Sequence, residues 1–337
     1  MPGTGPTATP VPAPAPPVTI LIDTDDHPAT TAQALASHHP AAGRITIDPT
    51  PATTAPAALA QDVLHALGKT CFGTPAGHGA WADSQAPAWT AVRAWITAMH
   101  ITDVTVTRAH RLTEPRLHQL LHLRERTGIH LTLLWHTGPS RTLTLLLAGT
   151  AHHTADTLDV STNPTGTAPG PAGRRSPRTS VPWLDPPPPL PGLPVSRTRR
   201  ALCDGIEALP HPDGPSPLQS DGAGELADRL HTVAHPLNAA ALTISLLTAT
   251  GPDRLAMLRG TDVHPHGTHV KLHDPHTHRH CRVHALPTWA HTLITAAHHH
   301  HLDTGRPPTS ALHPLITARN AATLTEHANA IRTRLPR

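Results

Sequence analysis

Residues 18–36 read VTILIDTDDHPATTAQALA, and this stretch decides the fold of the first half of the chain. It begins with the apolar run Val18–Ile22, passes through a polar turn with three aspartates, and continues in an Ala-containing segment after Pro28. β-Branched apolar runs favour strands, and proline favours the first position of a helix. The stretch therefore predicts a strand, a turn and a helix.

The same alternation continues to about residue 150. Strands are predicted at 44–47, 101–107, 129–134 and 142–147, and helices at 56–67, 88–99 and 114–127. Strands that alternate with helices and read as continuous apolar runs are typical of a parallel sheet covered on both faces. We expect an α/β domain over residues 17–150, preceded by a flexible Pro/Ala/Thr lead at 1–16.

The strand–turn–helix layout resembles a P-loop, whose pattern is G-x-x-x-x-G-K-[ST]. In this alignment the two glycines fall on Asp23 and Pro28, the lysine falls on Ala29, and the hydroxyl residue is Thr30. The glycines let backbone N–H groups surround the phosphates, and the lysine neutralises their charge. Only Thr30 is retained, so the residues argue against nucleotide binding. ATP and Mg²⁺ are expected as cofactors only if the altered loop still functions.

A second P-loop-like match, Gly68-Lys69-Thr70, follows a predicted helix rather than a strand. We interpret Gly68 as the C-terminal stop of that helix, since glycine is the residue most often found there.

A second stretch, residues 103–136, carries a strand, the sequence Ala109-His110-Arg111-Leu112, a Leu- and Arg-rich helix and another strand. It resembles the second nucleotide motif of AAA+ ATPases, especially the helper ATPases of DNA transposition, in which the strand ends in Asp-Glu-Ala-His-Arg-Leu. In that family the Asp and Glu hold Mg²⁺ and activate water, and here they are replaced by Thr107 and Arg108. The resemblance therefore implies an ATPase frame without its metal anchor or base.

Residues 151–222 are rich in Pro, Gly, Thr and Arg, and they include LDPPPPLPGLP at Leu184–Pro194. Such a composition does not build a packed core, so we interpret the range as a linker. Its proline-rich segment could bind an aromatic groove of a protein partner, or it could be a spacer, and the sequence leaves both open.

Residues 223–337 are predicted to form a mainly helical domain with a small β-hairpin. The segment holds Thr250-Gly251, then Leu258–Val263, strands near 268–272 and 281–285, and finally Leu286-Pro287 before a helix. This order resembles the first part of the catalytic domain of tyrosine recombinases, the phage integrases.

The family's chemistry requires a nucleophilic Tyr, and the sequence has none. A phosphotyrosyl intermediate cannot form in such a chain, so the resemblance implies a vestigial recombinase. Basic side chains in this region could still contact DNA phosphates, or they could be solvated surface charges. The candidates are Arg254, Arg259, Lys271, Arg279 and Arg282.

The remaining composition bounds the function. The three cysteines have no metal-ligand spacing, which favours a reducing cytoplasm. The 31 histidines have no sharply spaced acidic or cysteine partner, so no metal site is predicted. No run of 18 apolar residues occurs, so no membrane partner is expected.

Both resemblances point to mobile-DNA machinery. They favour a non-catalytic DNA-associated or regulatory protein, with possible DNA and protein partners. The alternatives are a nucleotide hydrolase with an altered loop and an adaptor that acts through its proline-rich segment.

Overall fold

A computed structural model describes the chain as two compact units. One consists of residues 1–56 and 101–158, and the other of residues 57–100 and 159–337. The described residues are 14–51, 53, 55–70, 80–138, 141–155, 195–199, 221–248, 250, 255, 257–273 and 280–307. Residues 57–100, which the strand–helix alternation placed inside the first domain, thus pack with the second unit.

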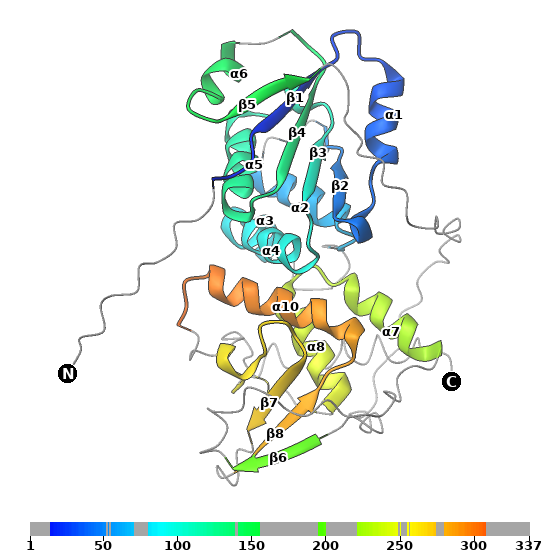
Figure 1. Cartoon of the computed structure of the whole chain (residues 1–337), viewed down its shortest axis with the longest axis vertical. Coiled ribbons are helices and arrows are strands. Elements are labelled where there is room, and N and C mark those ends of the chain that lie inside the picture. Colours follow the sequence, from blue (N-terminus) through cyan, green and yellow to red (C-terminus); the bar gives the residue numbers. More distant parts are fainter. Residues whose placement is uncertain are drawn as a thin grey trace, which may run out of the picture. The chain divides into compact units, whose positions relative to one another are not determined.

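The first unit is built on a five-stranded parallel sheet in the order β2-β3-β4-β1-β5 (Figure 1). This confirms the α/β fold class predicted from the strand–helix alternation. The strands are short, and their bounds are β1 Val18–Ile22, β2 Arg44–Ile47, β3 Asp103–Val106, β4 His130–Trp135 and β5 His152–Ala155.

The two faces of this sheet differ. One carries fully buried apolar side chains from every central strand, such as Ile47, Val106 and Leu133. The other carries a row of aligned threonines on four neighbouring strands, which are Thr46, Thr105, Thr132 and Thr19. Three of the four are only half-buried, so the prediction of continuous apolar strands is wrong for this face.

Three helices of the first unit are α1 Pro28–Ala36, α5 Glu114–Thr127 and α6 Arg141–Leu146, with short 3₁₀ turns η1 Pro40–Ala42 and η2 Ala109–Arg111. Helix α1 packs its Ala34 against Leu21 and Leu134, on the threonine face. Helix α5 buries Arg116, whose guanidinium donates to the carbonyl of Ala55 at 2.9 Å.

One predicted strand is a helix. The segment 142–147 was expected to be a strand, but it belongs to α6, and the fifth strand is β5 farther along the chain. Short runs of Thr and Leu fit either periodicity, and β5 is a polar edge strand, His-His-Thr-Ala, without an apolar signal. Strands β5 and β6 both fall inside the range 151–222 that the sequence assigned to the linker.

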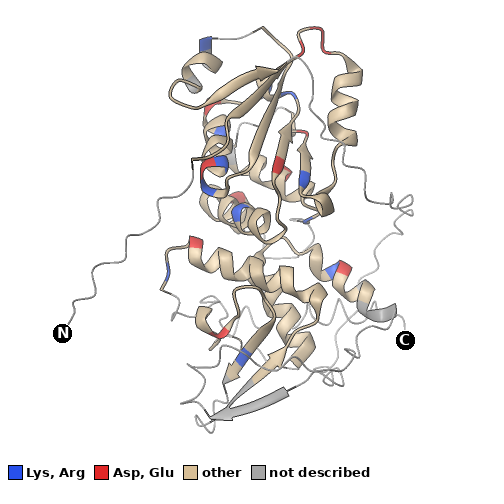
Figure 2. Ribbon diagram, in the orientation of Figure 1, with Lys and Arg blue, Asp and Glu red and all other residues tan. Residues whose placement is uncertain are grey.

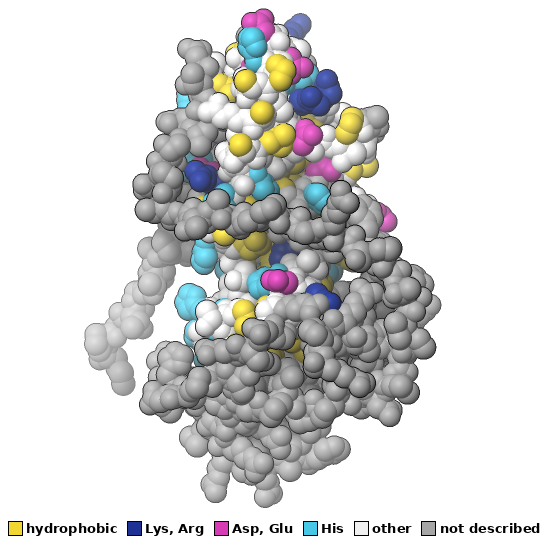
Figure 3. Space-filling model, turned by 90° about the vertical axis from the view of Figure 1, so that its right-hand side faces the viewer, with side chains coloured by type: hydrophobic (Ala, Val, Ile, Leu, Met, Phe, Trp, Pro, Cys, Tyr) yellow, Lys and Arg dark blue, Asp and Glu magenta, His cyan; other side chains and the backbone are white. Residues whose placement is uncertain are grey.

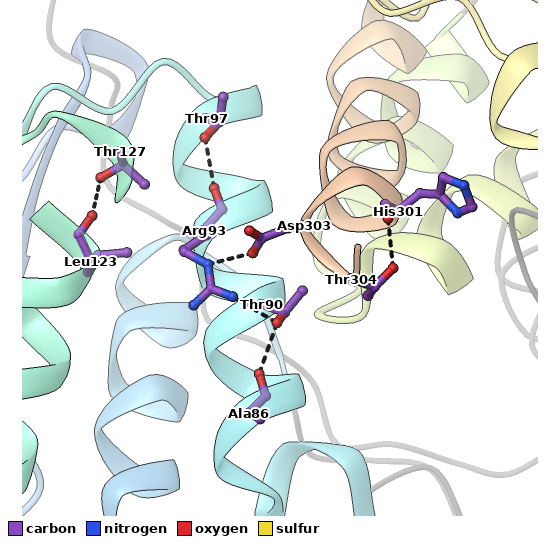
Figure 4. Close-up of polar contacts among 9 residues, drawn as sticks. All are labelled: Ala86, Thr90, Arg93, Thr97, Leu123, Thr127, His301, Asp303 and Thr304. Atoms are coloured by element: carbon purple, nitrogen blue, oxygen red, sulfur yellow. Dashed lines mark hydrogen bonds and ion pairs between the residues drawn. The ribbon is translucent and has the colours of Figure 1, made fainter. Parts of the chain in front are cut away.

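The second unit contains the helices α2 Pro56–Ala66, α3 Ala80–Asp83, α4 Gln85–Ala98, α7 Asp221–His231, α8 Pro236–Thr248 and α10 Thr288–Asp303. Helix α10 packs against α4 and α8. Arg93 of α4 reaches the carboxylate of Asp303 and also donates to Thr90 at 2.9 Å (Figure 4). The indole of Trp95, fully buried on α4, donates to the carbonyl of Ala234 at 2.6 Å.

Lys69, which follows α2, is hydrogen-bonded to the last residue of α7. Gly68 has φ +74°, as expected for the stop of α2. Lys69 is buried, and its Nζ donates to the carbonyl of His231 at 2.6 Å while lying 3.5 Å from the centre of the Trp95 ring. The P-loop-like triplet therefore ends α2 and packs against other elements of the second unit, and the prediction that Gly68 stops the helix is confirmed.

The hairpin expected after the recombinase-like motif is present. Strands β7 His269–His273 and β8 His280–Ala285 pair antiparallel, and β6 Val195–Arg199 adds to the free side of β8. The 3₁₀ turn η5 Gly260–Asp262 precedes the hairpin, and the buried carboxylate of Asp262 accepts the N–H of Arg259 at 2.9 Å. Within the described residues, no helix is both long and apolar enough to cross a membrane.

Candidate functional site

The strand order creates a switch point between β1 and β4. The chain leaves β1 toward β2 on one side of the sheet and leaves β4 toward β5 on the other side. The two connections therefore leave the carboxyl ends of neighbouring strands in opposite directions along the sheet, and open α/β sheets hold their ligands at such a point. The loop after β1 carries the three aspartates, and Figure 2 shows this acidic loop between β1 and α1.

At this point His136, directly after β4, lies beside two carboxylates from the loop after β1. Its Nδ1 is 3.1 Å from Oδ1 of Asp26 and 3.6 Å from Oδ2 of Asp23. The His136 and Asp23 side chains are almost completely buried, whereas that of Asp26 is half exposed. The buried Nε2 of His136 has no hydrogen-bond partner within the described chain. We call His136, Asp23 and Asp26 the acid–histidine cluster.

The carboxylate of Asp23 also forms a hydrogen bond at the start of α1. Its Oδ2 accepts the backbone N–H of His27 at 3.0 Å. The next residue, Pro28, has no N–H, and the N–H of Thr30 is bonded to the carbonyl of His27 at 3.0 Å. A P-loop offers such N–H groups to phosphates. Here the N–H group is absent at Pro28, and those of His27 and Thr30 are already hydrogen-bonded. The side chain of Ala29, at the lysine position, is an exposed methyl group.

The loop after β3 brings a second histidine to the cluster. Nδ1 of His110, on η2, lies 3.4 Å from the backbone N of His136, and the two rings are 5.6 Å apart. Partial burial, and then the nearby His136 and Arg111, lower the pKa of His110, while Asp26 opposes this effect. His110 thus places a second imidazole beside the acid–histidine cluster.

Two non-glycine residues beside this cluster have a left-handed backbone. Asp26 has φ +47° and Arg108 has φ +49°. Each such conformation costs about 1–3 kcal/mol and concentrates at functional sites in proteins. These two occupy the loops that correspond to the two nucleotide motifs.

A carboxylate from outside residues 103–136, which the sequence did not reveal, contacts Thr107. Thr107, at the position of the family's Asp, is fully buried and donates through Oγ1 to Asp48 at 2.6 Å. Asp48 directly follows β2, so the carboxyl-edge rule could have found it. His110 and His136 were also missed, although both follow predicted strands. Within the described part of the chain, no three His, Cys, Asp or Glu side chains are arranged to hold a metal ion.

The structure describes the backbone of three of the five predicted DNA-contacting residues, Arg259, Lys271 and Arg282. Arg259 is exposed beside η5, and Lys271 is half-buried on β7. Lys271 pairs in register with Val283, whereas Arg282 pairs with Leu272, so the two basic residues take alternating positions of the ladder. Arg254 and Arg279 lie outside the described residues, as does the proline-rich segment Leu184–Pro194.

No protein-family model matches the chain, and no curated protein matches it either. The functional argument therefore depends on the geometry of the chain itself.

Proposed function

We propose that the chain is a non-catalytic, DNA-associated protein whose P-loop-like site no longer takes a nucleotide. The observation that supports this proposal best is the carboxylate of Asp23, which accepts the N–H of His27 at the start of α1. A phosphate entering this position would have to displace a carboxylate and approach that of Asp26. Like charges at such short range disfavour binding strongly.

The DNA component of the proposal is supported by the basic hairpin. In the register of the three-stranded sheet Arg197 of β6 stands directly opposite Arg282 of β8. Phosphates accept hydrogen bonds from basic side chains without reference to base sequence, so the basic residues of this sheet suit contact with a nucleic-acid backbone.

The test measures ATP and duplex-DNA binding on the same full-length protein. We expect no Mg²⁺-ATP binding at millimolar nucleotide. We also expect the DNA affinity to fall steeply as the salt concentration rises from about 50 to about 200 mM, since six phosphate contacts lose about 10³-fold in affinity over this range. The double variant Lys271→Gln/Arg282→Gln should reduce the affinity and the salt slope. Arg141→Gln, an exposed arginine of the first unit, is the matched control.

Tight Mg²⁺-ATP binding would overturn the first part of the proposal. Absence of DNA binding at low salt, or equal affinity for the double variant and the native chain, would overturn the assignment of DNA contact to this hairpin.

A further inference from the structure

Six histidines of the second unit come together where the turn before β7 meets helix α10. The turn contributes His264, His266 and His269, and α10 contributes the other three. We call this set the histidine patch, and its members are His264, His266, His269, His291, His298 and His299. Histidine side chains are also scattered over the face of the molecule seen in Figure 3, so the patch is defined by proximity rather than by abundance.

The three turn histidines are held close together. The ring of His264 lies 4.6 Å from that of His269 and 5.5 Å from that of His266, measured between ring centres. The hydroxyl of Thr268 lies 3.0 Å from Nδ1 of His264 and 3.1 Å from Nδ1 of His269. One hydroxyl thus fixes two rings side by side.

The turn cannot easily move away from α10. Gly267 has φ +66°, and a Cβ built on it would lie 2.4 Å from the carbonyl oxygen of His291. The N–H of Gly267 donates to the carbonyl of His264 at 2.8 Å, and the carbonyl of Thr268 accepts the N–H of Leu286. This close approach of backbone to backbone holds the turn histidines next to those of the helix.

Within the described residues, the groups that act electrostatically on four rings of the patch are mainly basic. Burial comes first in lowering the pKa of His264, His269, His298 and His299, and neighbouring positive charges lower these values further. One carboxylate acts on these four rings, that of Asp303 on His299. The other groups that act on them from outside the four are basic, namely His266, His291, His301, His100 and Lys271.

We propose that the histidine patch is a proton-dependent surface for a polyanion, one that binds the phosphates of DNA more tightly as the pH falls. This inference depends on the proposed DNA association, and it specifies the surface and the pH at which DNA binding becomes tighter. Each imidazolium formed here meets other cations, so protonation is unfavourable in the free protein. A phosphate backbone lying along the patch places negative charge beside these rings and stabilises their cationic form, and binding therefore takes up protons.

The experiment titrates duplex DNA into the full chain at fixed ionic strength between pH 7.5 and 5.5, with EDTA present to remove metal ions. The native protein should bind at least about tenfold more tightly at pH 5.5, where imidazoles become cationic. The triple variant His264→Gln/His269→Gln/His298→Gln should lose most of this gain and keep its affinity at pH 7.5. The control His65→Gln removes an exposed histidine of α2 and should behave as the native chain does.

Proton uptake provides a second readout. Calorimetry at pH 6 in buffers of different ionisation enthalpy should report more protons taken up by the native chain than by the triple variant. If the triple variant does not fold, the single variant His269→Gln is used, and it should remove part of the uptake.

The outcomes separate the two proposals. DNA binding with the same pH dependence and proton uptake in native and variant chains overturns the histidine patch and leaves the proposed function standing. Absence of DNA binding at every pH overturns both.

Discussion

The acid–histidine cluster of the first unit and the histidine patch of the second unit use the same side chain in opposite electrostatic settings. In the cluster, the ring of His136 is buried with two carboxylates within 3.1 and 3.6 Å of its Nδ1. In the patch, rings lie next to other rings and to Lys271, with Asp303 as the acidic group acting on one of them. Burial and neighbouring cations lower the pKa of four rings of the patch, whereas the ring of His136 faces two carboxylates.

The difference teaches that histidine content alone does not specify chemistry. The carboxylates of the cluster put negative charge where a phosphate would enter, so this site disfavours an anion. The patch brings imidazoles together, so its protonation favours an anionic ligand.

Lys69 extends the contrast to a buried lysine without a carboxylate. Desolvation lowers its pKa from 10.5 to about 7. The unfolded chain therefore binds a proton between these pH values that the folded chain does not bind, and stability falls as the pH decreases from 10.5 to 7. We expect Lys69→Met to become progressively more stable relative to the native chain over this range, by up to about 4 kcal/mol at pH 7, since a tenfold change in proton affinity corresponds to about 1.4 kcal/mol.

Urea unfolding at pH 7, 8.5 and 10 measures this change, with Lys271→Met, the other lysine, as the control. A stability difference between Lys69→Met and the native chain that does not vary with pH would show that Lys69 stays charged when buried, held by the His231 carbonyl and the Trp95 ring.

Gly267→Ala is expected to separate the turn of the patch from α10. The new Cβ would meet the His291 carbonyl at 2.4 Å in a left-handed backbone, so the loss combines conformational strain with overpacking. Together these cost about 2–4 kcal/mol. Gly305→Ala is the matched control, because Gly305 has a similar φ of +68° and no atom within 4 Å of the added Cβ.

Thermal unfolding of the two glycine variants separates strain from contact. Gly305→Ala should lose about 1 kcal/mol, the usual cost of a side chain in this conformation. Equal losses in both variants would mean that the turn moves freely and that the patch is not held together by this approach.

Acid should destabilise the native chain through the patch. Because the pKa values of His264, His269 and His298 are lowered in the folded chain, the unfolded chain takes up protons first as the pH falls below about 6.5. Stability is complete above this pH and decreases below it. The triple glutamine variant should lose fewer degrees of Tm than the native chain between pH 7 and 5, and saturating DNA should reduce the native loss. A steeper loss in the variant would contradict this sign.

The sequence predicted the elements with a strong local signal. The strands at 18–22 and 44–47 and the helix at 114–127 have the predicted bounds, because apolar runs and a Gly128 stop define them locally. The hairpin was also predicted. The polar edge strand β5 and helix α6 were not, since neither has a distinctive periodicity. The packing of residues 57–100 with the second unit depends on contacts such as Trp95 with Ala234, which no local pattern encodes.

The two clusters were predictable to different degrees. Asp23 was recognised from the strand–turn–helix layout, and its partner His136 could have been found because both follow neighbouring parallel strands. The histidine patch joins residues about 30 positions apart across a turn and a helix. Its local sequence shows only many histidines. That the histidines near β7 lie close to those of α10 is shown only by the close approach of Gly267 to His291.

The smallest expected effect lies in the acid–histidine cluster. Asp23→Ala removes the carboxylate that accepts the His27 N–H at the start of α1 and one of the two carboxylates beside His136. Loss of this hydrogen bond costs about 1 kcal/mol, and the first unit should be destabilised by this amount at pH 7. Asp25→Ala removes an exposed carboxylate two residues away that does not accept this N–H, so it should leave the stability unchanged. Asp23→Ala also removes negative charge from the helix start, so inorganic phosphate should stabilise the variant but not the native chain. Equal stabilisation of both chains by phosphate would show that the Asp23 carboxylate does not occupy the anion position.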